Sequence, residues 1–195
     1  MIAFLRGKFA VKNPAQVIVD VGGVGYECQV SLNTYSAISN LDSGQLFTYV
    51  HITENNQTLY GFAEASEKEL FTQLISVSGV GAATARMMLS GMKPDEIIKA
   101  IVQSNARLLE SIKGIGRKTA ERLCLELKDK LSKNLNDAIL SSSSINNKIE
   151  IDALNALISL GIPKLNAEKA LKNVIDTNTG TIPLEDLIKK ALKNI

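Results

Sequence analysis

Residues 74–92 of this 195-residue chain read LISVSGVGAATARMMLSGM, and residues 109–127 read LESIKGIGRKTAERLCLEL. The two stretches are one pattern written twice, with each position 35 residues from its counterpart. Each copy predicts a helix, a Gly-x-Gly turn with a β-branched residue between the glycines, and a second helix with apolar residues at helical spacing. The matching pairs are Leu74/Leu109, Val77/Ile112, Gly79/Gly114, Val80/Ile115, Gly81/Gly116, Thr84/Thr119, Ala85/Ala120, Met88/Leu123, Leu89/Cys124 and Met92/Leu127.

The Gly-x-Gly turn suits the binding of an anion. Glycine lets the backbone adopt left-handed or strained conformations in a sharp turn, and the β-branched residue can pack between the flanking helices. The second helix begins directly after the turn, so its unpaired N–H groups and positive dipole end can hold a phosphate. One copy alone is more often an ordinary helix C-cap, but two copies favour a paired phosphate-binding module. The candidate phosphate-binding residues are Gly79, Val80, Gly81, Ala82, Gly114, Ile115, Gly116, Arg117, Lys118 and Arg122.

Positive charge gathers around the two hairpins. The formal net charge is only +2, but residues 61–135 hold twelve basic and nine acidic residues, whereas residues 136–195 hold seven of each. Arg117, Lys118 and Arg122 crowd the start of the helix after the second hairpin, where cations oppose the helix dipole. A bound anion explains that placement better than a solvated surface does.

Composition is typical of a soluble globular protein. Hydrophobic residues make up 45% and charged residues 22% of the chain, and no apolar stretch is long enough for a membrane span. The N-terminus has no signal-peptide pattern, so a cytoplasmic location is expected. Cys28 and Cys124 sit at apolar-face positions and are expected to be core residues rather than a disulfide.

Residues 1–62 show the pattern of short β-strands. Strands are expected over residues 1–10, 16–21, 26–30, 46–52 and 58–62, with a turn at 22–25 and a short helix near 35–40. Five antiparallel strands with one helix favour a small Greek-key barrel of the oligonucleotide-binding (OB) type. A simple meander remains an alternative.

Three further segments follow the predicted barrel. Residues 63–135 are expected to form an all-α domain that contains the tandem helix-hairpin-helix pair. The helical pattern fails from Ser132, and residues 136–147 are expected to be a flexible linker. Residues 148–195 show three apolar helical stripes and predict a three-helix, UBA-like domain that docks another protein. The expected fold is therefore α+β and multidomain.

Five stretches are specific enough to indicate a family. They are VGGVGYE at 21–27, LYGF at 59–62, SGVG at 78–81, LSGM at 89–92 and GIGRKTAERL at 114–123. With these stretches, and with its order of barrel, tandem hairpins, linker and three-helix tail, the chain resembles the RuvA family of Holliday junction branch migration subunits over its whole length.

The resemblance implies a scaffold that performs no chemistry. Such a subunit forms a homotetramer, or two tetramers as an octamer on DNA, and holds a four-way junction open through phosphate contacts that ignore base sequence. The implied protein partners are the hexameric ATPase RuvB, which drives branch migration in recombination and DNA repair, and the RuvC resolvase. RuvB would dock on the C-terminal domain, where the candidate residues at domain level are Leu154, Leu157, Leu171 and Leu187.

Two positions depart from the family pattern. The first hairpin of the family usually has a lysine two residues after its second glycine, where this chain has Ala83. We therefore expect the second hairpin to carry more of the affinity. The loop between the last two strands usually forms an acidic pin with two adjacent acids at the junction centre. Here Glu54 matches but Asn55 is neutral, so a weaker repulsion of phosphates is expected.

No sequence pattern indicates catalytic residues, a metal site or a cofactor. Lys118 and Thr119 lack the preceding glycine spacing of a Walker A loop, and no Gly-x-Gly has the third glycine of a dinucleotide fingerprint. Cys/His clusters for zinc are absent from the sequence, and His51, the only histidine, is expected to be structural or at the surface. Two alternatives stay open, a glycosylase or nuclease that holds DNA with the hairpins, and an RNA-binding accessory protein.

Overall fold

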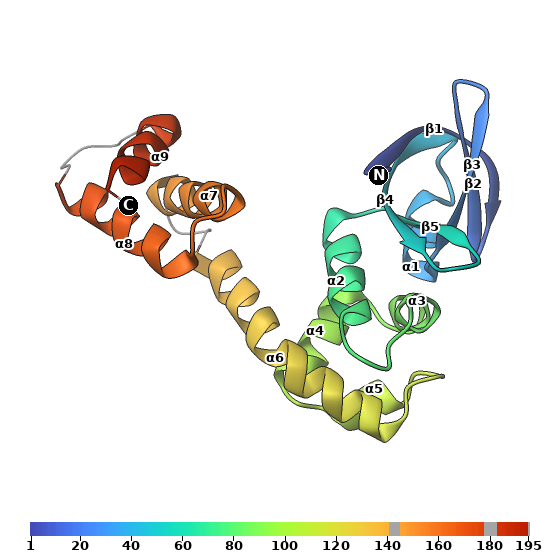
Figure 1. Cartoon of the computed structure of the whole chain (residues 1–195). Helices are drawn as coiled ribbons and strands as arrows, with labels where there is room; N and C mark the ends of the chain where they lie inside the picture. Colours follow the sequence, from blue (N-terminus) through green and yellow to red (C-terminus); the bar gives the residue numbers. More distant parts are fainter. Residues whose placement is uncertain (141–144, 178–182, 195) are drawn as a thin grey trace. The chain divides into compact units, whose positions relative to one another are not determined.

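A closed five-stranded barrel forms the N-terminal part of the chain in this computed structural model (Figure 1). Its strands are β1 (Phe4–Asn13), β2 (Gln16–Val21), β3 (Val24–Val30), β4 (Ser43–Ile52) and β5 (Gln57–Phe62). The order around the barrel is β1-β2-β3-β5-β4, and every neighbouring pair is antiparallel except β3 with β5. This order excludes the meander and confirms the Greek-key barrel. The expectation of antiparallel pairing throughout is wrong for β3 and β5, because β5 closes the barrel by lying parallel to β3.

The structure describes residues 1–140, 145–177 and 183–194, and it describes side chains for residues 1–132, 149–175 and 183–194. The chain forms two compact units, Met1–Ser132 and Lys133–Ile195. The first unit contains the barrel, both hairpin turns and the helices that flank them, up to residue 132 of the last helix.

The hairpin between β2 and β3 has a shorter turn than expected. Val21 pairs with Val24, so the turn consists of Gly22-Gly23 alone, and Gly25 lies within β3. Both turn glycines have positive φ (64° and 90°), which matches the two-residue turn that joins right-twisted strands.

The helix of the barrel, α1 (Leu32–Ile38), begins earlier in the chain than the expected helix near residues 35–40. The Ser31 hydroxyl oxygen accepts the N–H of Thr34 and so caps the first turn. The capping residue Ser31 is polar and does not belong to the apolar periodicity of the helix. A prediction from periodicity alone therefore placed the start of α1 too late in the chain.

The two hairpins follow the barrel and share one hydrophobic core with β5. Hairpin 1 comprises α2 (Ala65–Ile75), its turn and α3 (Ala82–Gly91), and α4 (Pro94–Val102) leads to hairpin 2, which comprises α5 (Ala106–Glu110), its turn and α6 (Arg117–Leu140). The shared core includes Tyr60 and Phe62 of β5, Phe71 of α2 and Leu123 of α6. Burial of these large side chains therefore joins the barrel to the hairpins within the first unit.

Helix α6 continues beyond the point where the sequence pattern fails. It runs to Leu140, although its last described buried residue is Leu131, and α7 already starts at Ile145. Residues 133–140 include leucine, lysine and alanine, which favour helix without an apolar stripe. Part of the expected linker is thus helical, and residues 141–144 lie outside the described residues.

The second unit contains α7 (Ile145–Ser159), α8 (Lys164–Thr177) and α9 (Leu184–Lys193). These helices enclose their own core, which confirms the predicted three-helix domain. Gly161, with φ of 90°, lies just beyond the end of α7, where its N–H bonds to the Ile158 carbonyl and the N–H of Ile162 bonds to the Leu157 carbonyl.

Candidate nucleic-acid interface

The turns of the two hairpins have the same geometry. The N–H of Val80 donates to the Val77 carbonyl at 3.0 Å, and the N–H of Ile115 donates to the Ile112 carbonyl at 3.0 Å. The helix after each turn begins in the same way, because Ala85 bonds to the Gly81 carbonyl and Ala120 to the Gly116 carbonyl, both at 2.9 Å. The predicted repeat is therefore confirmed at the level of single hydrogen bonds.

The two glycines of each turn have different roles. Gly79 and Gly114 have positive φ (93° and 94°), a conformation that side chains rarely adopt. Gly81 has φ of −82°, Gly116 is not among the glycines with positive φ, and a Cβ added to either residue would meet nothing within 4 Å. The expectation that both glycines serve the turn is thus wrong for the second one. Neither strain nor packing inside the protein requires glycine there, and the open space lies at the N-terminus of a helix.

The residue between the glycines packs inward as predicted. Val80 and Ile115 are each 5% exposed and belong to the shared core. Ala82, predicted to bind DNA, is also 5% exposed, so its side chain packs against the core while its backbone N–H belongs to the first turn of α3. These three side chains pack inward and hold the turns in shape. They therefore cannot contact an anion themselves, and at these positions only the backbone N–H groups can do so.

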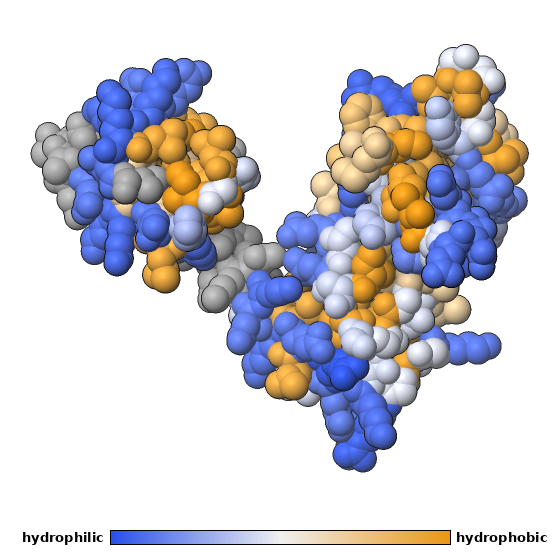
Figure 2. Space-filling view, viewed as in Figure 1, coloured by the Kyte–Doolittle hydropathy of each residue, from blue (hydrophilic) through white to orange (hydrophobic). Residues whose placement is uncertain are grey.

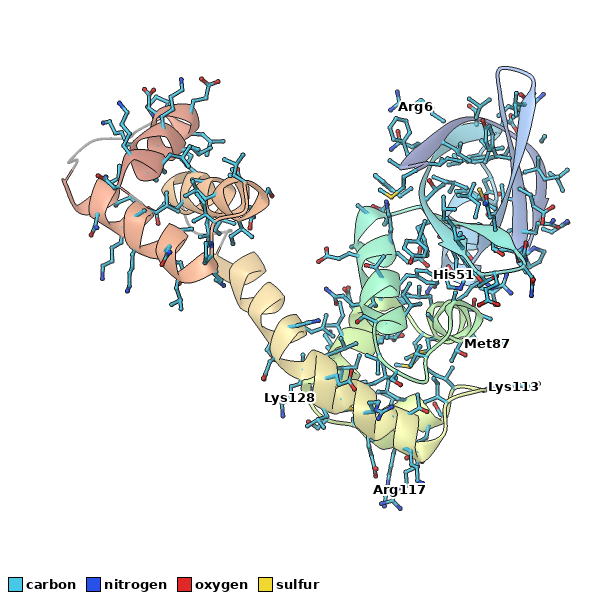
Figure 3. All side chains as sticks on the ribbon, in the orientation of Figure 1. Arg6, His51, Met87, Lys113, Arg117 and Lys128 are labelled. Carbon is cyan, nitrogen blue, oxygen red and sulfur yellow. The ribbon has the colours of Figure 1, made fainter. Side chains whose placement is uncertain are left out.

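Cations surround the turn of hairpin 2. Lys118 is exposed, and the exposed Arg117 pairs with Glu121 at 2.9 Å within α6. Sequence reasoning missed Lys113, which precedes Gly114 and projects away from the turn in Figure 3, as Arg117 does from the start of α6. A signal was available, because Lys113 adjoins the first glycine of the motif.

Arg122 has a structural contact that the sequence did not indicate. Its Nη1 donates to the Ser78 carbonyl in the turn of hairpin 1 at 3.1 Å, and its Nε lies 3.4 Å from a Glu126 carboxylate oxygen. The guanidinium therefore bridges the two hairpins, and it remains about half exposed at the surface between them.

Hairpin 1 has the same backbone geometry but lacks the cations. The positions equivalent to Lys113, Arg117, Lys118 and Arg122 are occupied by Ser78, Ala82, Ala83 and Met87. Ala83 is exposed on the first turn of α3, so a longer side chain would have room there. The cationic character of the candidate interface is concentrated in hairpin 2.

The loop between β4 and β5 places Glu54 and Asn55 at an exposed tip. The loop is closed at its base by the N–H and the hydroxyl of Thr53, which both donate to the Asn56 carbonyl, at 2.9 and 3.1 Å. The Asn56 amide also donates to the Thr58 hydroxyl at 3.3 Å. A short loop with these bonds can present one carboxylate in a defined position.

His51 lies in an aromatic cluster at the contact between the barrel and α2. Its ring stacks on Tyr49 and contacts the edge of Tyr60, and both tyrosines pack on Phe71 of α2. These contacts support the structural role expected for His51 and place the tyrosines in packing rather than in an open stacking surface for bases.

A buried carboxylate joins α2 to the barrel. Glu67 is 3% exposed and accepts hydrogen bonds from the hydroxyls of Ser31 and Thr34. Burial raises the pKa of Glu67 above 4.5, and the two hydroxyls, which favour the ionised form, offset only part of this effect. The neighbouring charges around the adjacent cavity of about 270 Å³ are those of Glu64, Lys93 and Asp95.

A raised pKa in the folded state makes stability fall with rising pH. The folded chain then binds the Glu67 proton more tightly than the unfolded chain, so this contribution is present below pH 4.5 and is lost as pH rises through the folded pKa. We expect the unfolding free energy of the wild type to fall relative to that of Glu67→Gln as the pH rises from 4.5 through the folded pKa. Urea unfolding of both proteins across this range measures the difference, and a constant difference would contradict the shifted pKa.

The leucines predicted to dock a partner lie mainly inside the C-terminal unit. Leu157, Leu171 and Leu187 are at most 5% exposed, and Leu154 is partly buried against the same core. Their side chains hold the three helices together. Among the residues of this unit whose side chains are described, the large apolar ones that are exposed are Ile158, Leu160, Leu165, Leu184 and Leu192. Figure 2 shows apolar atoms on the surface of the unit bordered by hydrophilic ones.

Comparisons with known proteins cover the whole chain. Family models match residues 1–61 (RuvA N terminal domain), 71–129 (SAM-like helix-hairpin-helix tandem) and 150–195 (RuvA, C-terminal domain). A protein of Cytophaga hutchinsonii is 46% identical, with 99% of each chain covered, and one of Flavobacterium psychrophilum is 45% identical over the full length of both chains. The chain belongs to the RuvA family. Both relatives are named Holliday junction branch migration complex subunit RuvA, and this membership confirms the predicted family and fold class.

Two kinds of feature are absent from the described part of this RuvA family member. No helix there is long and apolar enough to cross a membrane. Among the same residues, no group of three or more His, Cys, Asp and Glu side chains could hold a metal ion.

Proposed function

We propose that this chain is the non-catalytic, junction-binding subunit of a branch migration complex, and that it holds a four-way DNA junction through phosphate contacts. Membership of the RuvA family supports this role, and the pair of congruent hairpins supplies the means. The proposed domains are a barrel with the acidic pin (1–62), a hairpin domain (63–135), a linker (136–147) and a docking domain (148–195).

The open space at the second glycine of each turn carries the proposal. Gly81 and Gly116 need not be glycine for any reason inside the protein, yet both stand at the start of a helix. A phosphate oxygen that bonds to first-turn N–H groups must approach the backbone closely, and a Cβ would obstruct it. Contacts of this kind position DNA and carry no sequence information, as branch migration through any sequence requires.

A symmetric assembly fits this role. We propose a homotetramer, with an octamer on DNA as a further form, because four copies can present the same hairpin pair to the four arms of a junction. The proposed protein partners are the RuvB ATPase and the RuvC resolvase, which follow from family membership. In each subunit Glu54 would supply one pin charge and Asn55 none.

The proposed docking surface for RuvB is the corner between α7 and α8. Leu160 and Leu165 are 64% and 71% exposed there, and backbone hydrogen bonds from Gly161 and Ile162 to α7 support the corner. Exposed apolar side chains on a rigid support can bury area against a partner with little loss of conformational entropy. Because Leu157 and Leu171 lie in the core, they would support this surface from inside.

A titration against two DNA forms tests the proposal. The purified chain is titrated in gel-shift assays against a synthetic four-way junction and a linear duplex with the same arm sequence, at one moderate salt concentration. Strong preference for the junction supports the scaffold role. Equal affinity for both forms would reduce the function to nonspecific hairpin binding.

Lys118→Ala tests the phosphate role of hairpin 2. We expect weaker binding to all junction sequences alike, and a salt dependence that flattens by about 0.9 in log–log slope for each phosphate that the variant no longer neutralises. Lys99→Ala, which removes an exposed lysine of α4, is the matched control and should change little. A weakening that depends on junction sequence would argue against a phosphate contact.

Ala83→Lys tests the charge difference between the hairpins. Because Ala83 is exposed and equivalent to Lys118, we expect the new lysine to strengthen junction binding and to steepen the salt slope by about 0.9 for each additional phosphate that it neutralises. Gln103→Lys adds the same charge at an exposed site outside the turns and serves as the control. Equally strengthened binding in both variants would mean that only net charge matters.

A further inference from the structure

A set of four polar residues ties hairpin 1 to the barrel. We call Ser31, Asn33, Thr34 and Glu67 the α1 clasp. Ser31 and Thr34 donate their hydroxyl protons to the two carboxylate oxygens of Glu67, with Thr34 at 2.6 Å from Oε2. Asn33 donates its amide to the carbonyls of Leu89 and Met92, at 2.6 and 2.9 Å.

The hydrogen-bond directions within the clasp are determined by the backbone. The Ser31 oxygen accepts the N–H of Thr34, and the Thr34 oxygen accepts the N–H of Ala63, both at 3.0 Å. Each hydroxyl therefore turns its proton toward Glu67, and both oxygens of that carboxylate act as acceptors. Ser31, Thr34 and Glu67 are 1%, 0% and 3% exposed, so loss of any of these three leaves buried polar groups without partners.

The clasp reaches both helices of hairpin 1. Glu67 lies on α2, whereas the carbonyls that Asn33 caps lie at the C-terminal end of α3. Two further bonds support the same contact, since Arg86 of α3 donates to the Gln29 side chain and to the Ala15 carbonyl of the barrel. Hairpin 1, which lacks cations at its turn, is thus the hairpin with these polar ties to the barrel.

We propose that the α1 clasp is a positioning device that fixes hairpin 1 relative to the barrel and its pin loop, and that it sets the preference for a junction over a duplex. This inference rests on the proposed function. Hairpin 2, with its exposed cations, supplies affinity for any phosphate backbone. Hairpin 1 supplies a phosphate site at a fixed place relative to Glu54.

The physical reason is that a junction and a duplex differ in how their phosphates are arranged in space. A junction and a duplex present the same phosphates, so preference must come from the simultaneous fit of several contacts in one arrangement. A loosened hairpin lowers the effective concentration of the second contact once the first is made. That loss falls on junction binding, while single-hairpin contacts to duplex DNA persist.

Thr34→Val and Thr34→Ser provide a matched test in the full-length chain. Valine removes the hydroxyl that serves both Glu67 and the N–H of Ala63, whereas serine retains it. In the titrations above we expect Thr34→Val to lose about tenfold in junction affinity, with duplex affinity and its salt slope nearly unchanged. Thr34→Ser should behave as the wild type, and so should Glu64→Gln, which removes an exposed acid next to the clasp.

A distance measurement without DNA makes the test independent of the proposed function. With a large excess of unlabelled chain, so that at most one subunit of a tetramer carries labels, spin labels at Lys8→Cys on the barrel and Ala83→Cys on hairpin 1 are expected to give one narrow distance distribution in the wild type and in Thr34→Ser. Thr34→Val should broaden it, and an unchanged width would overturn the inference. Should Thr34→Val fail to fold, Asn33→Ala releases the α3 end of the clasp instead and carries the same expectations.

The DNA results separate the two claims. If the wild type prefers junctions and Thr34→Val keeps that preference or loses both affinities equally, the clasp does not set selectivity and the inference is wrong. If the wild type shows no preference, the proposed function fails, and the selectivity half of the inference fails with it.

Discussion

Gly116→Ala is expected to lose most of the junction affinity of the chain while its stability stays the same or rises slightly. The backbone at Gly116 does not have a positive φ, and the added Cβ would meet no protein atom within 4 Å. Replacement of glycine by alanine at such a site stabilises a protein by about 0.4–1 kcal/mol. The same Cβ would occupy the space through which a phosphate reaches the first-turn N–H groups, and we expect at least about a tenfold loss, or about 1.4 kcal/mol.

Gly114→Ala in the same turn is the matched control. Gly114 has φ of 94°, so alanine there is strained, and we expect a stability loss of about 1–3 kcal/mol. Thermal unfolding and gel-shift titration of both variants separate the two effects. Wild-type binding by a stable Gly116→Ala variant would show that no ligand approaches this glycine closely.

The paired change Leu160→Asp with Leu165→Asp is expected to abolish stimulation of the RuvB ATPase and leave junction binding intact. Burial of a leucine side chain contributes about 1.5–3 kcal/mol, and a carboxylate in its place resists burial in an apolar contact. Because both side chains are largely exposed in the free chain, the fold of the C-terminal unit should persist. We expect at least about a 100-fold loss of RuvB affinity.

Asn166→Asp on the same corner is the control for added negative charge. Asn166 is exposed, and its substitution by aspartate adds one negative charge without loss of apolar area. Titration of RuvB ATPase activity with each variant measures docking, and circular dichroism checks the fold. Full stimulation by the Leu160→Asp/Leu165→Asp variant would move the docking surface elsewhere on the unit.

The two hairpins combine equal geometry with unequal charge. The hydrogen bonds of their turns agree closely, yet the cations gather at hairpin 2, whereas the clasp of Ser31, Asn33, Thr34 and Glu67 ties down hairpin 1. Although Ala83 supplies no charge, hairpin 1 can still contribute to junction binding if it places a phosphate contact correctly rather than adding electrostatic attraction. The absence of a cation at Ala83 thus agrees with a division between affinity and placement.

Local features of the molecule could be predicted from the sequence because short segments decide them. The repeat around Gly79 and Gly114 predicted the hairpins, and the apolar stripes around Leu157 and Leu187 predicted the C-terminal helices. The resemblance in the same residues pointed to the family that the comparisons show. The start of α1 was predicted less well, because a serine cap rather than periodicity determines it.

Contacts between distant segments were decided by the tertiary structure alone. Periodicity shows which face of a strand is apolar but not which strand lies beside it, so the parallel pairing of β3 with β5 was missed. The bridge from Arg122 to Ser78 and the burial of Glu67 against Ser31 likewise join residues far apart in the chain. The two Gly-x-Gly turns follow from the sequence alone, since backbone conformation depends on near neighbours, whereas their attachment to the barrel and their shared arginine arose only when the chain packed into one core.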